Sequence, residues 1–329
     1  MPDYLMRKVL KAKYMKKTMR VLVTGGLGFI GRHLIRELVN RDHEVVVIDN
    51  LYHNQKIESF DFGRKIKFVL GDIRDLAFLE KELQGIEIVF HLAALSSIKD
   101  ACENPEYCFS TNVTGTFNVL MASLKNNVGK IIFTSSREAY GNAKSLPVRE
   151  DAPLNPVNLY GASKASCEHF CNVFRKNYKM NIIILRLANV YGPDDPGRNR
   201  VIPTILRKIK NGEDITINGG SQILDFVWIE DVVKVLVESI NQRDNETLNV
   251  GSGRGISIND LAEMILKSSK SNVKLIMAPK VSSEVEKFVA DISMAGIKPL
   301  PLEEGLKKMF KEEKISFSNT CKIDDAKSI

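Results

Sequence analysis

A tyrosine and a lysine stand four residues apart, in the segment Tyr160-Gly-Ala-Ser-Lys164. On a helix this spacing puts both side chains on one face. A free tyrosine has a pKa of about 10 and is a poor base at neutral pH, but a neighbouring cation favours the phenolate and lowers that value. We therefore expect Tyr160, with Lys164 beside it, to take a proton from an alcohol while a hydride leaves the same carbon.

Three hydroxyl side chains follow the expected strand at residues 130–133, in the segment Thr134-Ser-Ser-Arg-Glu-Ala-Tyr-Gly141. Catalytic groups collect at the carboxyl ends of parallel strands. Ser136 is therefore expected to hydrogen-bond the reacting oxygen and to hold it near Tyr160. The alternative is a hydroxyl that caps a turn, which this residue type also does.

Residues 21–31 read as an apolar strand, a glycine-rich turn and the start of a helix. The spacing of Gly25, Gly28 and Gly31 allows backbone N–H groups to approach a pyrophosphate, and the positive end of the following helix points to the same place. Asp49 ends the next apolar run, where a carboxylate can hydrogen-bond a ribose 2′-hydroxyl. We expect a bound NAD rather than NADP, since Asp49 would repel a 2′-phosphate. A ligand-free turn is the alternative.

Alternating strands and helices must position these side chains. The runs interpreted as strands are residues 21–24, 44–49, 67–71, 88–92, 130–135 and 181–187. The helical patterns between them cover residues 31–41, 75–83, 106–126 and 159–178. This alternation predicts the α/β class, with a doubly wound parallel Rossmann sheet.

The chain becomes less regular after Gly192, where prolines and glycines interrupt it and helices are expected over residues 201–210 and 231–241. We expect an NAD-binding Rossmann domain over 20–190, to which segments around 222–250 return. Residues 191–317 would form mainly a smaller, mixed C-terminal substrate-binding region that covers the carboxyl edge of the sheet, where ligands of open α/β sheets bind. A polar tail would follow at 318–329.

The composition bounds the class of protein. The chain has 329 residues, is 44% hydrophobic and carries a net charge of +7, so it can bury a sizeable core. Residues 1–19 form a basic leader without the apolar segment of a secretory signal, and we interpret it as a disordered extension. No apolar run is long enough to span a bilayer.

The five cysteines do not resemble a disulfide framework and fit a reducing compartment. Cys167 and Cys171 are four residues apart and are interpreted as packing residues on one helix face. We therefore expect a cytoplasmic protein that has no metal site and that binds neither nucleic acid nor membranes.

Together these segments resemble the extended short-chain dehydrogenases/reductases, and among them the NAD-dependent nucleotide-sugar epimerase/dehydratase family. The matching segments, in the order typical of the family, are residues 24–31, 49–50, 71–75, 91–94, 112–116, 135–141, 160–164 and 186–193. The resemblance spans roughly residues 20 to 310 and implies NAD as the cofactor. It also implies a nucleotide sugar as the substrate, with UDP as the expected nucleotide.

The resemblance implies a role for each matching position. The residues that would bind the cofactor are Gly25, Gly28, Phe29, Ile30, Asp49, Asn50, Asp72, Ile73, Leu92, Ala93, Ala94, Asn112, Tyr160 and Lys164. The catalytic group would be Ser136, Tyr160 and Lys164, with Glu138 as a further candidate. The residues that would bind the substrate are Ser136, Asn189, Arg200, Val201 and Lys280.

The resemblance leaves two kinds of reaction open. An epimerase needs Tyr160, Ser136 and NAD to oxidise C4 of the sugar and to return the hydride to the opposite face. Dehydratases and decarboxylases add an acid, and Glu138 stands where they have a glutamate, but Arg137 stands where 4,6-dehydratases have an aspartate. We expect C4 epimerisation of a UDP-hexose of the UDP-glucose/UDP-galactose type. The alternatives are a dehydratase, a decarboxylase or a 4-ketosugar reductase, and a non-catalytic NAD-binding sensor or scaffold.

Two departures from the family bear on the substrate. Leu224 stands where the family often has an arginine on the substrate's phosphates, and leucine cannot replace a bidentate phosphate contact. Lys280 stands where a second such arginine is expected. A different nucleotide, weaker binding, or phosphate contacts from Arg198, Arg200 or Lys280 would each account for these changes.

The resemblance also implies a homodimer with a four-helix interface, built from helices 106–126 and 159–178. The residues alone indicate only that these helices carry apolar faces, which the sheet could equally bury.

Overall fold

The computed structural model describes residues 18–52, 65–196, 200–241, 243–269, 271–279 and 285–312. The polar tail at 318–329 and all but the last two residues of the basic leader lie outside the described residues. So do Arg198 and Lys280.

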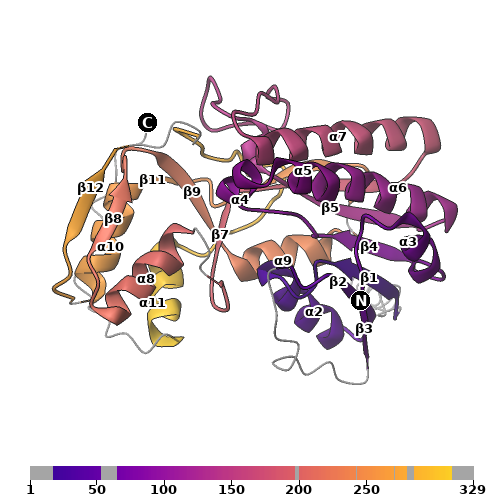
Figure 1. Cartoon of the computed structure of the whole chain (residues 1–329), viewed down its shortest axis with the longest axis horizontal. Helices are drawn as coiled ribbons and strands as arrows, with labels where there is room; N and C mark the ends of the chain where they lie inside the picture. The colour runs from indigo at the N-terminus through magenta and orange to yellow at the C-terminus, as the bar shows by residue number, and fades with distance from the viewer. Residues whose placement is uncertain are drawn as a thin grey trace, which may run out of the picture.

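A seven-stranded parallel sheet forms the larger part of the molecule, in the order β10-β6-β5-β4-β1-β2-β3 (Figure 1). Its strands are β1 (Arg20–Thr24), β2 (Glu44–Asp49), β3 (Ile66–Leu70), β4 (Ile88–His91), β5 (Lys130–Ser136), β6 (Ile182–Leu187) and β10 (Thr247–Val250). From β1 the chain adds β2 and then β3 on one side, and it then returns to add β4, β5, β6 and β10 on the other side. The direction of strand addition therefore reverses between β1 and β4. Ligands of such sheets bind at this point, beyond the carboxyl ends of the strands.

Helices cover both faces of the sheet, which confirms the doubly wound fold. Val21 and Val23 pack in the cluster that includes α2 (Phe29–Asn40) and α9 (Ile229–Glu238). Leu22 points to the opposite face, as alternate residues of a strand do, and packs with the other layer. The helices of that layer are α3 (Leu76–Glu82), α6 (Gly115–Lys125) and α7 (Leu159–Tyr178).

One long helix was predicted over residues 106–126, and the structure divides it. The short α5 (Pro105–Cys108) leads into a π-helical turn, η2 (Phe109–Thr114), before α6 begins. A further helix, α4 (Ile98–Glu103), and a 3₁₀ turn, η3 (Arg137–Ala139), were not predicted. Short elements like these lack the several periods of apolar residues by which a helix is recognised in a sequence.

The smaller region is mixed, as expected. It contains a three-stranded sheet of β11 (Gly255–Ser257), β9 (Ile223–Trp228) and β7 (Asn189–Tyr191), and a parallel pair of β8 (Ile215–Asn218) and β12 (Leu275–Ala278). Its helices are α8 (Val201–Asn211), α10 (Ile258–Ser269) and α11 (Leu302–Glu312). Figure 1 places β8, β12, α8, α10 and α11 to one side of the large sheet, while α9 and β10 return to that sheet. Among the described residues, no helix has the length and apolar character needed to cross a membrane.

Candidate active site

A cavity of about 1120 Å³ lies at the carboxyl ends of the central strands. The glycine turn after β1, the end of β5 and the first turns of α7 and α8 all contribute to its wall. The structure thus brings the predicted cofactor turn and the predicted catalytic residues to one space, although they are more than 100 residues apart in the sequence.

The glycine turn is built so closely that side chains would not fit. Gly25 has a φ of +67°, and a Cβ added to it would lie 2.7 Å from the backbone of Ala93, at the end of β4. A Cβ on Gly31 would lie 2.6 Å from the carbonyl oxygen of Gly25. Helix α2 begins directly after Gly28, which provides no side-chain cap for the first N–H groups. These groups and the bare turn fit a pyrophosphate.

Asp49, the acid predicted to contact the ribose, ends β2 and is hydrogen-bonded to the glycine turn. The carboxylate of Asp49 accepts hydrogen bonds from the N–H groups of Leu27 (3.0 Å) and Leu51 (2.8 Å). Asp49 also lines the cavity, beside Asn50. Its place at the end of β2 and beside the glycine turn fits the ribose contact that the sequence predicts.

Replacement of Gly25 by alanine is expected to abolish NAD retention. The left-handed backbone costs an alanine about 1–2 kcal/mol, and the contact with Ala93 forces the turn to move. The measurement is the amount of NAD extracted per purified chain. Gly212→Ala is the matched control, because Gly212 has a φ of +71° but nothing within 4 Å of the added Cβ. Wild-type NAD content in Gly25→Ala would contradict this account of the turn.

Most of the residues expected to bind the cofactor line the cavity, and two do not. Those that line it are Gly25, Gly28, Phe29, Ile30, Asp49, Asn50, Ile73, Leu92, Ala93, Ala94, Tyr160 and Lys164. Asp72 instead pairs with Arg74 at 2.7 Å and accepts a hydrogen bond from Asn50. Burial would raise the pKa of Asp72, but the hydrogen bonds from Arg74 and Asn50 outweigh it and lower the pKa to about 2.

Asn112, the second residue expected to contact the cofactor, is not among the residues that line the cavity. Asn112 lies in η2 and is buried, and its side chain exchanges hydrogen bonds with the backbone N–H (2.8 Å) and carbonyl (3.1 Å) of Leu95. It also donates to Ser163 Oγ on α7. Asn112 therefore positions the segment after β4 against the helix that carries Tyr160.

Helix α7 presents Tyr160 and Lys164 in its first two turns. The side chain of Asn158 caps the helix by accepting a hydrogen bond from the N–H of Gly161 (2.8 Å). Gly161 allows the helix to lie directly on η3, because a Cβ there would be 2.3 Å from the carbonyl oxygen of Glu138. Lys164 is buried, and its Nζ donates to the carbonyl oxygen of Thr134 at 2.8 Å.

The sequence predicted a lowered pKa for Tyr160, but in the structure of the chain this pKa is raised. Burial raises the pKa of Tyr160 to about 12, although the Ser136 hydroxyl and the charge of Arg200 act to lower it. Lys164 Nζ lies 5.9 Å from the centre of the Tyr160 ring and is occupied by Thr134. The expectation failed because desolvation of the phenol outweighs a cation at this distance.

The segment after β5 places Ser136, Arg137 and Glu138 in the cavity wall. Ser136 Oγ accepts a hydrogen bond from the N–H of Glu138 (3.1 Å), which begins η3. The carboxylate of Glu138 accepts a hydrogen bond from Asn158 Nδ2 at 2.7 Å on Oε2, while Oε1 lies 2.8 Å from Arg137 Nη2 in an ion pair and has no hydrogen-bond partner among the described residues. Sequence reasoning noted Arg137 only as a substitution, and its place in the cavity was missed.

The substrate side of the cavity is lined by Asn189, Arg200, Val201 and Leu224. Among the described residues, the Nη1 atom of Arg200 makes two long contacts, with the carbonyl oxygen of Val190 (3.4 Å) and with Asp195 (3.5 Å). Leu224 lies in β9 and brings no charge to the wall, as its sequence position predicted. The roles of these residues toward a substrate stay predictions.

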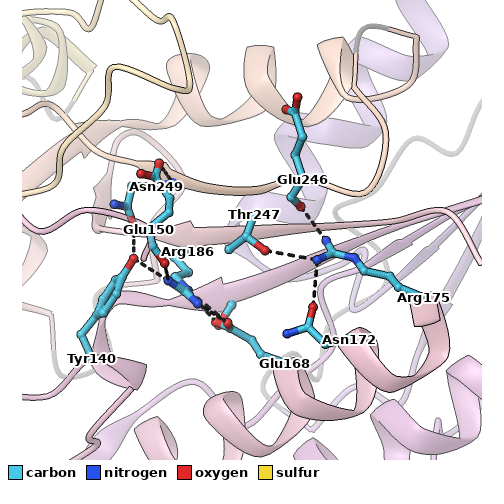
Figure 2. A network of polar contacts seen from close by, with 10 residues as sticks. Tyr140, Glu150, Glu168, Asn172, Arg175, Arg186, Glu246, Thr247 and Asn249 are labelled. Carbon is cyan, nitrogen blue, oxygen red and sulfur yellow. Dashed lines mark hydrogen bonds and ion pairs between the residues drawn. The ribbon is translucent and has the colours of Figure 1, made fainter. Parts of the chain in front are cut away.

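A buried polar network connects α7, the helix that carries Tyr160, with the large sheet (Figure 2). Glu168 on α7 and Arg186 on β6 form an ion pair at 2.7 Å, and Ser135 on β5 also donates to Glu168. Arg186 Nη1 donates to the Tyr140 hydroxyl (2.7 Å), which in turn donates to Asn249 on β10 (2.7 Å). The network therefore ties α7 to three strands and fixes the helix that carries Tyr160.

Comparison with known proteins agrees with this geometry. A family model described as the NAD dependent epimerase/dehydratase family matches residues 21–251. The chain belongs to this family. It is therefore an enzyme of the nucleotide-sugar epimerase/dehydratase kind with NAD as its cofactor, and the turn, the strand ends and the cavity fit that cofactor.

Individual relatives differ in their reactions. A putative UDP-glucose 4-epimerase of Methanocaldococcus jannaschii is 36% identical over 298 residues, which cover 88% of this chain and 96% of the relative. The crystal structure of the Thermotoga maritima UDP-glucose 4-epimerase with UDP-glucose superposes with a TM-score of 0.85 and 33% identity, covering 90% of this chain and 99% of that one. A UDP-N-acetyl-alpha-D-glucosaminuronate decarboxylase of Bacillus cytotoxicus is 33% identical over 279 residues, 80% of this chain and 84% of the relative.

Proposed function

We propose that the enzyme epimerises C4 of a UDP-linked hexose of the UDP-glucose/UDP-galactose type. The observation that carries the proposal is the meeting of Ser136, Tyr160 and Lys164 with the glycine turn in one cavity. The names of the relatives from Methanocaldococcus jannaschii and Thermotoga maritima support the same reaction and the same nucleotide.

Each catalytic residue has a separate role at C4 of the sugar. Ser136 holds the C4 oxygen by a hydrogen bond, and Tyr160 takes its proton and later returns it. NAD, when bound, supplies a reversible hydride acceptor and a positively charged ring that favours the phenolate. Lys164 stays fixed by Thr134 near the Tyr160 ring, where its charge acts in the same direction. The cavity encloses these groups, so the ketone can turn without leaving them.

The environment of Glu138 favours epimerisation over dehydration or decarboxylation. A catalytic acid or base must exchange a proton with the substrate. One carboxylate oxygen of Glu138 accepts a hydrogen bond from Asn158, the other lies in an ion pair with Arg137 without a hydrogen bond among the described residues, and the residue is only 3% exposed. An ion pair with a buried guanidinium suits a structural role for this carboxylate.

Substitution of Glu138 by glutamine is expected to change the turnover by less than about threefold. A dehydratase or decarboxylase that used Glu138 would lose about 100-fold or more. The measurement is the initial rate per folded, NAD-loaded enzyme, with chromatography to distinguish an epimeric hexose from a 4-keto-6-deoxy or pentose product. A large loss together with either of the latter products would favour the runner-up reaction, which the Bacillus cytotoxicus relative's name represents.

The direct test of the proposed function is incubation of the NAD-loaded enzyme with UDP-glucose, UDP-galactose and other nucleotide sugars, followed by chromatography of the products. Interconversion of one C4-epimeric pair is expected. If no nucleotide sugar is converted while NAD remains bound, the enzyme proposal fails in favour of a sensor or scaffold.

We also propose a homodimer through the outer face of α6 and α7. Apolar side chains lie exposed on this layer, namely Phe109, Phe117, Leu159, Val173 and Tyr178. Phe117 makes edge-to-face contacts with Phe170 and Phe174 on α7, so the two helices present one continuous apolar surface. A second copy of this surface is the partner that matches it.

The substitution Val173→Lys is expected to convert the dimer to a monomer, because it places a charge in the apolar interface. Analytical ultracentrifugation gives the mass of each species. Met277→Lys is the control, since Met277 is similarly exposed but lies on β12, away from this surface. A wild-type protein that sediments as a monomer at micromolar concentration would contradict the proposal.

We place the enzyme in the cytoplasm. Cys102, Cys108, Cys167 and Cys171 are free thiols, as in proteins of a reducing compartment. Fluorescence microscopy of a tagged full-length chain tests this placement.

A further inference from the structure

Two tyrosine rings stack on each other in the wall of the catalytic cavity, and neither has a role in the proposed chemistry at C4. Tyr52 follows β2 and Tyr107 lies in α5, and both line the cavity. The centres of their rings lie 4.4 Å apart, and the ring planes are 20° from parallel. Two segments that are distant in the sequence therefore meet in this part of the wall.

The neighbours of the stack place it beside the adenosine half of the predicted NAD site. Asn50 directly follows Asp49, the acid expected at the ribose, and both line the cavity. The Nδ2 atom of Asn50 donates to the Tyr107 hydroxyl at 3.2 Å, and Asn50 Oδ1 accepts a hydrogen bond from the N–H of Tyr52 at 3.1 Å. One side chain next to the ribose acid thus contacts both tyrosines.

The segment after β3 holds Tyr107 as well. The guanidinium of Arg74 lies over the Tyr107 ring, 4.8 Å from its centre. Arg74 is itself fixed by Asp72 at 2.7 Å, and Asp72 also accepts a hydrogen bond from Asn50 at 2.9 Å. Contacts at Tyr107 therefore join three segments around the adenosine site, namely those after β2, after β3 and in α5.

The stack leaves no room for the adenine between its two rings. A planar ring that lies between two others needs their centres about 7 Å apart, twice an ordinary carbon–carbon contact of about 3.5 Å. The separation of 4.4 Å shows that the tyrosines contact each other instead. Tyr52 is 46% exposed, so the pair stands on the solvent side of the site.

We propose that the Tyr52–Tyr107 stack is a gate at the adenosine end of the cofactor site, which must open for NAD to enter or leave. A contact between two groups of the protein raises the barrier to both passages equally, and it does not by itself favour the bound state. The gate therefore slows NAD exchange without strengthening NAD binding. The inference requires only NAD as the cofactor and does not depend on which sugar reaction the enzyme catalyses.

Exchange of bound NAD tests the gate. NAD-loaded enzyme is mixed with an excess of isotopically labelled NAD, and mass spectrometry of the retained cofactor gives the dissociation rate constant. Equilibrium dialysis at several free NAD concentrations gives Kd, and the two values together give the association rate constant. In Tyr52→Ala and in Tyr107→Ala, both rate constants are expected to rise by about 3- to 10-fold, the contribution of an aromatic pair, while Kd changes by less than about twofold.

Tyr52→Phe is the matched control, because it keeps the ring and the stack, and it should exchange NAD at the wild-type rate. Met294→Ala controls for the loss of a large exposed side chain, since Met294 is 51% exposed and lies outside the cavity wall. The double variant Tyr52→Ala with Tyr107→Ala should exchange NAD no more than about twofold faster than either single variant, because both substitutions break the same contact.

Two results would overturn the proposal. If Kd weakens in step with faster dissociation while association is unchanged, the rings stabilise bound NAD and are not a gate. If both alanine variants exchange NAD at the wild-type rate, NAD does not pass the stack. Damage to the fold would weaken Kd, so faster exchange at constant affinity distinguishes the gate from a merely structural role. The proposed function is judged by product formation, and the two proposals therefore fail independently.

Discussion

Replacement of Tyr160 by phenylalanine is expected to lower the turnover of the nucleotide sugar by about 10²- to 10⁴-fold, the usual contribution of a positioned acid or base. The substitution removes the one atom that can take the C4 proton and leaves the ring in place. NAD binding should persist, because the glycine turn and the residues after β2 and β4, which line the cavity, are expected to bind most of the cofactor. The loss should therefore appear in kcat rather than in cofactor content.

The measurement combines the chromatographic rate with the amount of NAD extracted per chain. Tyr178→Phe is the matched control, since Tyr178 lies at the other end of α7 and is 51% exposed. It should retain the wild-type rate. If Tyr160→Phe keeps more than about a tenth of the wild-type rate, another group takes the proton, and the role given to Tyr160 is wrong.

Replacement of Glu168 by leucine is expected to lower the free energy of unfolding by about 3–5 kcal/mol, because it leaves the charge of Arg186 buried and without its carboxylate. Glu168 and Arg186 are almost completely enclosed, with side-chain exposures of 1% and 7%. The Nε and Nη2 atoms of Arg186 both donate to this carboxylate (Figure 2). The remaining contacts of Arg186, to Tyr140 and to the backbone of Glu150, bring no negative charge.

Urea denaturation followed by circular dichroism measures the change. Glu263→Leu is the control, because Glu263 forms an exposed i,i+4 pair with Lys267, and such pairs contribute only about 0.3–0.5 kcal/mol. The double substitution Glu168→Leu with Arg186→Met should recover much of the loss, since it removes both charges. A single variant as stable as the wild type would contradict the account of this network.

The main elements of the fold could be predicted because their signals are local. The ranges expected for residues 44–49 and 159–178 coincide with β2 and α7, and the other predicted strands agree within about a residue at each end. Buried parallel strands are short apolar runs, and a long helix carries several periods of its apolar face. Strand β10 lacks this signal, because it is only four residues long and its assignment depends on its pairing with β6.

The sequence by itself determined the cofactor turn. The close contacts that require Gly25, Gly28 and Gly31 are made within the turn and with the chain after β4, and the predicted fold class already places that strand beside β1. Only the tertiary structure decided the electrostatics of the site. Burial, and not Lys164, dominates the pKa of Tyr160, while Arg137 and Glu138 are fixed by Asn189 and Asn158 from other segments. Desolvation and hydrogen bonding depend on which groups are in contact in the folded structure. Residue types and their spacing along the chain do not specify these contacts.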